Sequence, residues 1–507
     1  MSNIVTRILN EVDHRPDILD CIANLSSDEV FTPPNMVDKV LDALPEEVWS
    51  NPSLKWLDPA TKTGVFLRQI TYRLMIGLKD KFPDEEERRQ HIFQNMIYGI
   101  GITELTALMA RRSLYTSKNA SSEESVAHFQ SPNGNIDYEN RTHTYVNGNC
   151  KYCGNKETDA QLGGRGEDQE RHAYKFIHLT AEEASNMKFD VIVGNPPYQL
   201  KDGGHGSSAA PIYQLFVQQA KRLQPRYMSF IIPSRWFSGG KGLDKFRAEM
   251  LADKRIKVMY DYPRASDCFP GVEIKGGVMY FVWEAEYSGD CEVHTLIGEE
   301  ELPVTKRPLN EFDVFIRYNQ AVPIYEKVKD RNEETLDKIV SSRKPFGLAT
   351  NFADYDQINN PDKVKIYANK KTGYIRRERV QVNSSWINSW KIFTAKANNI
   401  GTESPDDNLN VIIGEPGTCC TETYVVIGAG QLHSKEQAEN LKKYLQTRFV
   451  RFLISLKKVT HDATARVYGF VPNLPMDQTW TDEKLYERYE ITQAEQKFIE
   501  SVIAEMK

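Results

Sequence analysis

The stretch Phe189-Asp190-Val191-Ile192-Val193-Gly194-Asn195-Pro196-Pro197-Tyr198 decides how the rest of the chain is interpreted. Its run of β-branched residues predicts a buried strand, and Gly194 followed by two prolines predicts that this strand stops at a rigid loop. Each proline fixes its own φ and favours extended geometry in the residue before it. We therefore expect the Asn195 amide and the Pro196 carbonyl to act together as acceptors for one amino group, with Tyr198 offering a face to a planar base.

The string Asn195-Pro196-Pro197-Tyr198 resembles the catalytic motif of amino-methyltransferases. These enzymes use S-adenosylmethionine (SAM) to methylate an exocyclic or amide nitrogen. The resemblance implies that Asn195, Pro196, Pro197 and Tyr198 are catalytic, but it does not identify the substrate. The alternative is a proline-rich turn after a strand. We favour the catalytic interpretation because the flanking segments also fit the family.

Composition limits the class of protein. A chain of 507 residues exceeds what one hydrophobic core usually serves, so at least two domains are expected. No apolar run reaches the ~18 residues that a membrane span needs, and the amino terminus lacks the apolar core of a signal peptide. Seven cysteines, two of them adjacent, fit a reducing compartment. We expect a soluble cytoplasmic protein, and the family resemblance implies a bacterial or phage-encoded one. The net charge of −6 argues against a wholly basic nucleic-acid binder but leaves local basic surfaces possible.

A helix is predicted to start at the prolines that follow Phe31-Thr32, because apolar residues recur at helical spacing from Met36 to Leu41. In the family, a Phe-Thr-Pro string ahead of the sheet contacts the methionine end of SAM. The resemblance therefore implies that Phe31, Thr32 and Pro33 bind the cofactor. A helix N-terminus without a ligand is the alternative.

The segment Trp56–Leu67 predicts a strand end, a tight loop and a helix, which is how Rossmann-like sheets bind nucleosides. It resembles the family's SAM loop, Asp-Pro-x-x-Gly-x-Gly, which implies that Asp58, Pro59 and Gly64 bind SAM. Lys62 replaces the first glycine of that pattern. A lysine there must either keep an ordinary conformation or bear strain.

The pattern Met96–Ile102 predicts the second strand, with a helix after it. Enzymes of this class carry an acid at the end of this strand that binds the ribose of SAM, but this position is Gly101. We expect Glu104 to reach back from the helix start instead. A solvated first-turn glutamate favoured by the helix dipole is the alternative.

Residues 117–171 are polar and irregular, which predicts an insertion. Within it, Cys150-Lys151-Tyr152-Cys153-Gly154 has the spacing of a zinc knuckle. His143, His172, His128 or His178 could complete a tetrahedral structural zinc site with Cys150 and Cys153, and two free thiols are the alternative. Zinc is not expected in the chemistry, because transfer from a sulfonium needs no Lewis acid.

Strands and helices alternate from about residue 54 to 285, which predicts a mostly parallel sheet with ligands at its carboxyl edge. The resemblance assigns the turn beginning at Phe269 to the wall of the target-base pocket, and a buried turn aromatic is the alternative. Residues 1–300 are thus expected to be the SAM-binding catalytic domain, with the insertion inside it. Residues 301–507 are expected to be a target recognition domain that binds DNA.

Basic and aromatic residues are interleaved in the second part of the chain, with a surplus of about seven positive charges between residues 341 and 400. Such clustering predicts phosphate contacts, although a charge run is often only a solvated face. The residues expected to contact DNA are Arg343, Lys344, Lys370, Lys371, Arg376 and Arg377.

The order of Phe-Thr-Pro string, SAM loop, catalytic loop and recognition domain resembles the gamma order of bacterial DNA adenine methyltransferases, particularly those of restriction-modification systems. The resemblance implies an α/β, Rossmann-like methyltransferase sheet followed by a mixed α+β domain. It also implies transfer from SAM to the N6 amine of an adenine flipped out of duplex DNA. Any cleavage is expected to belong to a separate restriction endonuclease.

Three other functions remain open from the sequence. RNA bases and protein glutamine offer similar nitrogens, although a protein-glutamine enzyme would not need a basic domain of this size. Loss of the loop glycine and of the strand-end acid would also suit an inactive DNA-binding specificity subunit. Failure to bind SAM would distinguish that subunit from an enzyme.

Overall fold

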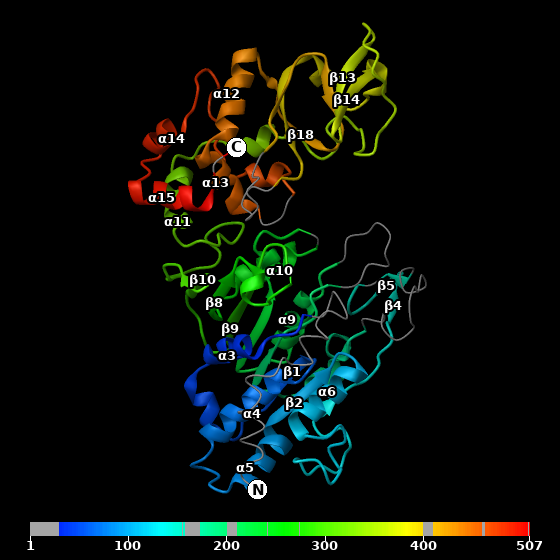
Figure 1. Cartoon of the computed structure of the whole chain (residues 1–507), viewed down its shortest axis with the longest axis vertical. Helices are drawn as coiled ribbons and strands as arrows, with labels where there is room; N and C mark the ends of the chain where they lie inside the picture. The colour runs from blue at the N-terminus through cyan, green and yellow to red at the C-terminus, as the bar shows by residue number, and fades with distance from the viewer. Residues whose placement is uncertain are drawn as a thin grey trace. The chain divides into compact units, whose positions relative to one another are not determined.

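The computed structural model describes residues 30–154, 156–157, 173–199, 210–240, 242–272, 274–398, 409–458, 462–504 and 506. They form two compact units, of which the first ends at Glu311 and the second begins at Phe312. The boundary lies beyond residue 300 because the strand Thr305–Arg307 still pairs with the sheet of the first unit. Figure 1 shows both units and labels many of their helices and strands.

The first unit is built on a ten-stranded sheet in the order β11-β10-β8-β9-β7-β6-β1-β2-β3, with β12 also paired to β10. The strands from β3 to β7 along this order are parallel, and β9 runs antiparallel to both β7 and β8. The predicted mostly parallel sheet is therefore confirmed. The strands are β1 Trp56–Thr61, β2 Ile97–Gly101, β3 Ile136–Asp137, β6 Val191–Gly194, β7 Tyr227–Pro233, β8 Ile256–Tyr262, β9 Val278–Glu284, β10 Cys291–Ile297, β11 Glu300–Glu301 and β12 Thr305–Arg307.

Strands β1, β6 and β7 are buried along their whole length, as expected where helices cover both faces of a parallel sheet. The apolar residues predicted to face the core are buried in both α3 and α4. The helices of this unit are α3 Pro34–Asp42, α4 Val65–Gly77, α5 Glu85–His91, α6 Glu104–Tyr115, α8 Ala181–Asn186, α9 Tyr213–Arg222 and α10 Asp244–Ala252. Shorter turns are η2 Glu46–Ser50, η3 Ile92–Met96, η4 Lys175–His178, η5 Ser234–Phe237 and η6 Ala265–Asp267.

A small hairpin stands apart from the large sheet. Its strands, β4 (Tyr145–Val146) and β5 (Asn149–Cys150), pair with each other, and Asn149 also forms an isolated bridge with Lys156. Asn147 and Gly148 join them, both with positive φ, which is the conformation that a two-residue type I′ turn requires. The hairpin lies in the segment predicted to be an insertion.

The second unit combines two three-stranded sheets, β14-β13-β17 and β16-β15-β18, with five helices among its described residues. Its hydrophobic clusters consist of its own residues, so this unit has its own core and the mixed α+β composition that was predicted. The strands are β13 Lys363–Ala368, β14 Lys371–Arg376, β15 Trp390–Ala395, β16 Ile412–Gly414, β17 Thr418–Cys420 and β18 Tyr424–Leu432. The helices are α11 Ala321–Lys329, α12 Lys435–Gln446, α13 Arg448–Lys457, α14 Asp482–Arg488 and α15 Gln493–Val502, and the turns are η7 Leu336–Ile339, η8 Arg377–Arg379, η9 Ser384–Asn388 and η10 Ala465–Tyr468.

Within the described ranges, no helix has both the length and the apolar character that a membrane crossing would require.

Candidate active site

Asp58 is a buried acid and the third residue of β1. Its Oδ1 accepts a hydrogen bond from the Ala60 amide at 3.1 Å. Burial raises the pKa of this carboxyl from 3.8 to about 7, against the opposing effects of the Ala60 amide, Thr61 and the Lys62 charge. A Cβ at Gly194 would lie 2.7 Å from Asp58 Oδ1, so only glycine lets β6 end this close to the acid.

Lys62 lies in the loop between β1 and α4, at the position where the family pattern has a glycine. Lys62 is not among the residues with positive φ, so it has an ordinary backbone conformation and bears no strain of that kind. Its side chain is 7% exposed, and Nζ donates to the Val30 carbonyl at 2.7 Å. Pro59 is buried within β1, and Gly64, with φ of 77°, is the N-cap residue just before α4.

Asn195 contacts the same carbonyl from the catalytic loop. Its Nδ2 donates to the Val30 oxygen at 3.2 Å and to Thr32 Oγ1 at 3.0 Å. The Val30 carbonyl therefore accepts from both Lys62 and Asn195, and it joins three segments that the sequence places far apart. Asn195 Oδ1 is buried and makes no hydrogen bond of normal geometry to a described residue. The only sequence signal for this contact is a lysine at a position where the family pattern has glycine, and that signal does not reveal which group the lysine contacts.

The Phe-Thr-Pro string lies beside the catalytic loop through Thr32, which is buried and accepts from Asn195. Phe31 and Pro33 are half-buried. The Pro33 carbonyl accepts from the amides of Met36 and Val37 and so starts α3.

The two aromatic residues of the candidate site, Tyr198 and Phe269, are buried from solvent. Pro196, Pro197 and Tyr198 are buried, and so is Phe269, just after η6. Burial raises the pKa of Tyr198 well above 10, and Cys268 adds to this effect, whereas the Asn195 amide opposes it. Since Cys268 influences Tyr198, the turn that ends at Phe269 lies near the catalytic loop.

The end of β2 has no room for an acid. A Cβ at Gly101 would lie 2.7 Å from the Ala107 Cβ of α6, so any larger residue would displace this helix. Glu104 is the first residue of α6 and is exposed. The helix is capped instead by Thr103 and Thr106, which satisfy each other's backbone amides. Among the described residues, no hydrogen bond or ion pair joins Glu104 to Asp58, and the ribose-binding role of Glu104 stays a prediction.

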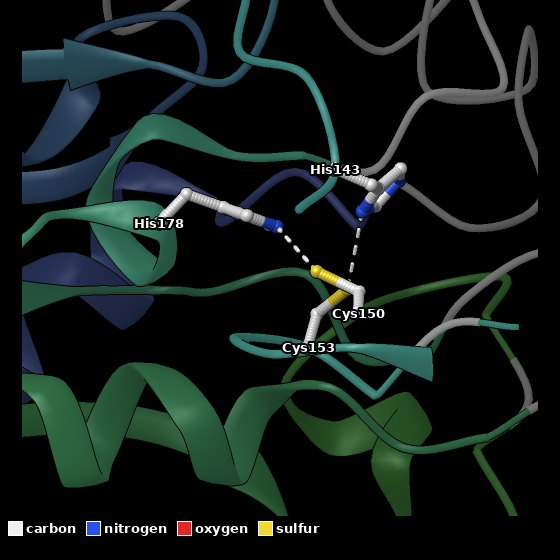
Figure 2. A group of neighbouring side chains, drawn as sticks. All are labelled: His143, Cys150, Cys153 and His178. Carbon is white, nitrogen blue, oxygen red and sulfur yellow. Dashed lines mark hydrogen bonds between the residues drawn. The ribbon is translucent and has the colours of Figure 1, made fainter. Parts of the chain in front are cut away.

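Cys150 and Cys153 lie with two histidines. The ligand atoms of His143, Cys150, Cys153 and His178 are all within 4.8 Å of one another. Figure 2 shows the four side chains pointing toward a common centre. His172, another histidine considered, lies outside the described residues.

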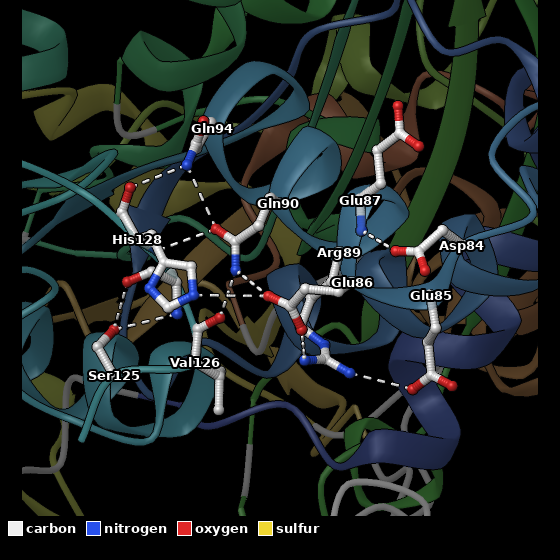
Figure 3. Close-up of polar contacts among 11 residues, drawn as sticks. Asp84, Glu85, Glu86, Glu87, Arg89, Gln90, Gln94, Ser125, Val126 and His128 are labelled. Carbon is white, nitrogen blue, oxygen red and sulfur yellow. Dashed lines mark hydrogen bonds and ion pairs between the residues drawn. The ribbon is translucent and has the colours of Figure 1, made fainter. Parts of the chain in front are cut away.

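His128, one of the histidines considered as a fourth ligand, lies outside this group and makes other contacts. Its amide donates to Gln90 Oε1 at 2.9 Å, its carbonyl accepts from Gln94 at 2.8 Å, and its ring nitrogen lies 3.6 Å from Glu86. Gln90 also donates to the Val126 carbonyl at 2.8 Å. These contacts hold the chain after α6 against α5 and η3 (Figure 3).

The basic residues expected to contact DNA all lie in the second unit and are exposed: Arg343, Lys344, Lys370, Lys371, Arg376 and Arg377. Lys370 and Lys371 lie at the turn between β13 and β14. In the described part of the chain, Lys344, Lys370 and Lys371 form no ion pair or side-chain hydrogen bond, so their charges are available to a ligand.

The arginines of this set already have partners. Arg343 Nη2 lies 2.8 Å from a carboxylate oxygen of Glu422, which is largely buried and also pairs with Lys396 at 3.3 Å. Arg377 donates to Asn388 at 2.6 Å. Arg343 therefore has a structural role whether or not it contacts a ligand.

Comparison of the sequence with known proteins finds a matching family model and a close relative. Residues 95–269 match the model of the Eco57I restriction-modification methylases. An uncharacterized adenine-specific methylase of Mycoplasma pneumoniae is 36% identical over 368 residues, which cover 65% of this chain and 87% of that protein.

Two solved structures are similar at lower identity. The type IIL restriction-modification enzyme MmeI, in complex with DNA, has 12% identity and a TM-score of 0.46, with 86% of this chain and 64% of that chain covered. The modification subunit of a putative type I restriction enzyme from Vibrio vulnificus YJ016 has 16% identity and a TM-score of 0.34, with 58% and 51% covered. The chain thus spans between about half and two thirds of these two solved chains.

Proposed function

This chain belongs to the family of adenine-specific restriction-modification methylases, and on that premise we propose that it transfers a methyl group from SAM to the N6 amine of adenine in DNA. One structural observation supports this most directly. Asn195 Oδ1 is a buried acceptor without a hydrogen-bond partner among the described residues, and such an atom costs free energy unless a ligand supplies a donor. The exocyclic amine of adenine is a donor of the required kind.

The residues of β1 and of the loop after it fit SAM. Asp58 is buried, and its raised pKa means that a nearby positive charge would stabilise its ionised form. SAM carries positive charges on its sulfonium and amino groups. Asp58, Pro59 and Gly64 would hold it in the loop, with Phe31, Thr32 and Pro33 on the other side, and Glu104 is proposed for the ribose. When bound, SAM supplies an electrophilic methyl group.

The catalytic loop prepares the amine as a nucleophile. The amine's lone pair is delocalised into the purine ring. Two acceptors, Asn195 Oδ1 and the Pro196 carbonyl, would draw its hydrogens out of the ring plane and free that lone pair for attack. Asn195 is already oriented, because its Nδ2 is fixed by Val30 and Thr32. Positioning of this kind needs no covalent enzyme intermediate.

Recognition of DNA is proposed for the second unit, through Lys344, Lys370 and Lys371 with the neighbouring arginines Arg376 and Arg377. The target adenine must leave the duplex to reach Asn195. Tyr198 and Phe269 are proposed to hold the base by stacking. Since both are buried here, entry of a base requires the residues covering them to move.

The partners of this reaction are also proposals. Duplex DNA is the substrate, and a restriction endonuclease encoded separately would cleave the unmethylated sequence. Zinc at Cys150 and Cys153 would have no part in the transfer itself.

The test is methyl transfer from labelled SAM to unmethylated plasmid DNA, followed by digestion and mass identification of the modified nucleoside. We expect N6-methyladenine. Label in RNA or protein but not DNA would contradict the substrate, and absence of SAM binding would favour an inactive specificity subunit.

The Asn195→Ala variant should lose transfer while it still binds SAM. The matched control is Asn135→Ala, which removes another partly buried asparagine that bonds to main-chain carbonyls of Phe93 and Gln94. The control should retain transfer. Turnover by the Asn195 variant would refute its assignment.

A further inference from the structure

We propose that His143, Cys150, Cys153 and His178 bind one structural zinc ion. Cys150 Sγ lies 3.6 Å from His178 Nε2, and Cys153 Sγ lies 3.4 Å from His143 Nδ1. The four ligand atoms are within 4.8 Å of one another, and Figure 2 shows them facing a common centre. This proposal does not depend on the methyltransferase reaction.

The distances fit a tetrahedral ion. Zinc binds sulfur at ~2.3 Å and nitrogen at ~2.0–2.1 Å, so a sulfur and a nitrogen on the same tetrahedral zinc are ~3.5 Å apart. The two sulfur–nitrogen separations in the structure, 3.6 Å and 3.4 Å, agree with this value. Two cysteines and two histidines are also a complete ligand set for structural zinc, with no position left for water.

The orientation of His178 is fixed by a second contact. Its Nδ1 lies 2.9 Å from the Tyr174 carbonyl. A carbonyl can only accept, so Nδ1 must carry the proton, and Nε2 then keeps a lone pair on the side of Cys150. Metal-binding histidines usually have such an outer hydrogen bond, which sets the tautomer and the ring orientation.

The surrounding fold explains why an ion would be needed. The β4–β5 hairpin has strands of two residues each, and Val146 is 54% exposed, so the hairpin has little apolar surface to bury. Isolated two-stranded hairpins are marginally stable in water. A metal ion would supply the stability that packing does not, as in small zinc modules.

The ion would join the hairpin to the main fold. His178 ends η4, and this turn packs on α9 through Phe176 and Phe216, whose ring centroids are 5.8 Å apart. From η4 the chain continues through α8 into β6 and Asn195. The zinc would therefore anchor the insertion to a turn that is separated from β6 and Asn195 only by α8 and its flanking residues.

The first experiment is metal analysis of the purified full-length protein, combined with X-ray absorption at the zinc edge. We expect about one zinc per chain, with two sulfur ligands at ~2.3 Å and two nitrogen ligands at ~2.0–2.1 Å. No zinc in protein from zinc-supplemented cells, and no uptake of Zn²⁺ by the reduced protein, would overturn the proposal. A disulfide between Cys150 and Cys153 in freshly purified protein would also overturn it.

Variants separate ligation from folding. Cys150→Ser should lose the zinc, whereas Cys291→Ser, which changes a buried free cysteine of β10, should keep it. His178→Cys should also keep the ion, with three sulfurs in its absorption spectrum, because cysteine replaces one accepted ligand by another. Retention of a full equivalent by Cys150→Ser would contradict the ligand set, and this result can be read from any soluble variant.

Discussion

At the scale of single residues, Lys62 shows how a departure from a family pattern can be accommodated. The lysine does not need the backbone freedom of glycine, and its ammonium group reaches the Val30 carbonyl. That carbonyl is also bonded to Asn195. Lys62 thus helps to fix the segment that contains Val30, and Asn195 binds the same segment through the same carbonyl.

The variant Lys62→Met should test this role. Loss of a hydrogen bond from a charged group costs about 1.5–3 kcal/mol, so we expect the free energy of unfolding to fall by that amount and methyl transfer to fall at least about tenfold. Denaturant unfolding and transfer assays measure the two effects. Lys79→Met, at an exposed position, is the control. The variant Lys62→Gly restores the family residue. If its stability and methyl transfer equal those of the parent, the hydrogen bond from Lys62 to Val30 contributes to neither.

Asp58 predicts a dependence on pH. Its pKa is about 7 in the folded protein and near 3.8 in the unfolded chain. The folded state therefore binds the proton more tightly, and this residue's contribution to stability is lost as pH rises from about 4 to beyond 7. Asp58→Asn should remove that part of the pH dependence, measured as the difference in Tm between variant and parent from pH 5 to 8.5.

The affinity for SAM should change in the opposite direction. The ionised carboxylate attracts a cationic ligand, so we expect SAM to bind more weakly as pH falls below about 7. Calorimetric titration across this range measures the effect. The Asp58→Asn variant should show a nearly flat profile, and a profile identical to the parent's would exclude Asp58 from the cofactor site.

At the scale of elements, the turn between β13 and β14 is the clearest candidate for contact with phosphates. Lys370→Gln with Lys371→Gln should weaken DNA binding and reduce the slope of log affinity against log salt by about 0.9 for each lost phosphate contact. A salt titration of DNA binding measures the slope. Neutralising Lys329 and Lys497, exposed on α11 and α15, is the matched control for total charge. Equal slopes in the two double variants would remove this turn from the interface.

Elements were predictable where their signals are local. The apolar run of β6 and the spacing of α4 are set by neighbouring residues, so the sequence predicts them correctly. The lack of space for an acidic side chain at the end of β2 could not be predicted, because it depends on how closely Ala107 packs against Gly101. The grouping of two cysteines and two histidines was partly predictable. The Cys-x-x-Cys spacing of Cys150 and Cys153 is visible in the sequence. Which histidines lie beside them depends on which segments the fold brings next to the hairpin.

The hydrogen bonds from Lys62 and Asn195 to the Val30 carbonyl could not be predicted from the sequence, for a different reason. A main-chain carbonyl has no side-chain signature, so no motif marks it. Only the approach of Lys62 and Asn195 in space identifies it as part of the candidate site.

At the scale of the whole molecule, the two units should fold independently. The hydrophobic clusters of the second unit contain residues only from beyond Phe312. We expect residues 312–507, expressed alone, to unfold in one cooperative transition and to bind DNA with a strong dependence on salt, but without binding SAM. Thermal unfolding followed by circular dichroism checks the first part. A fragment without a cooperative transition would show that this core is insufficient.

The shared carbonyl of Val30 has a consequence for the order of events in catalysis. A ligand that shifts the Lys62 loop changes the geometry of the hydrogen bond that Asn195 makes to the same oxygen. Cofactor and target base should therefore bind cooperatively, and by thermodynamic reciprocity each should change the affinity of the other by the same factor. After transfer, loss of the methyl group from the cofactor would weaken this coupling and favour release of the modified strand.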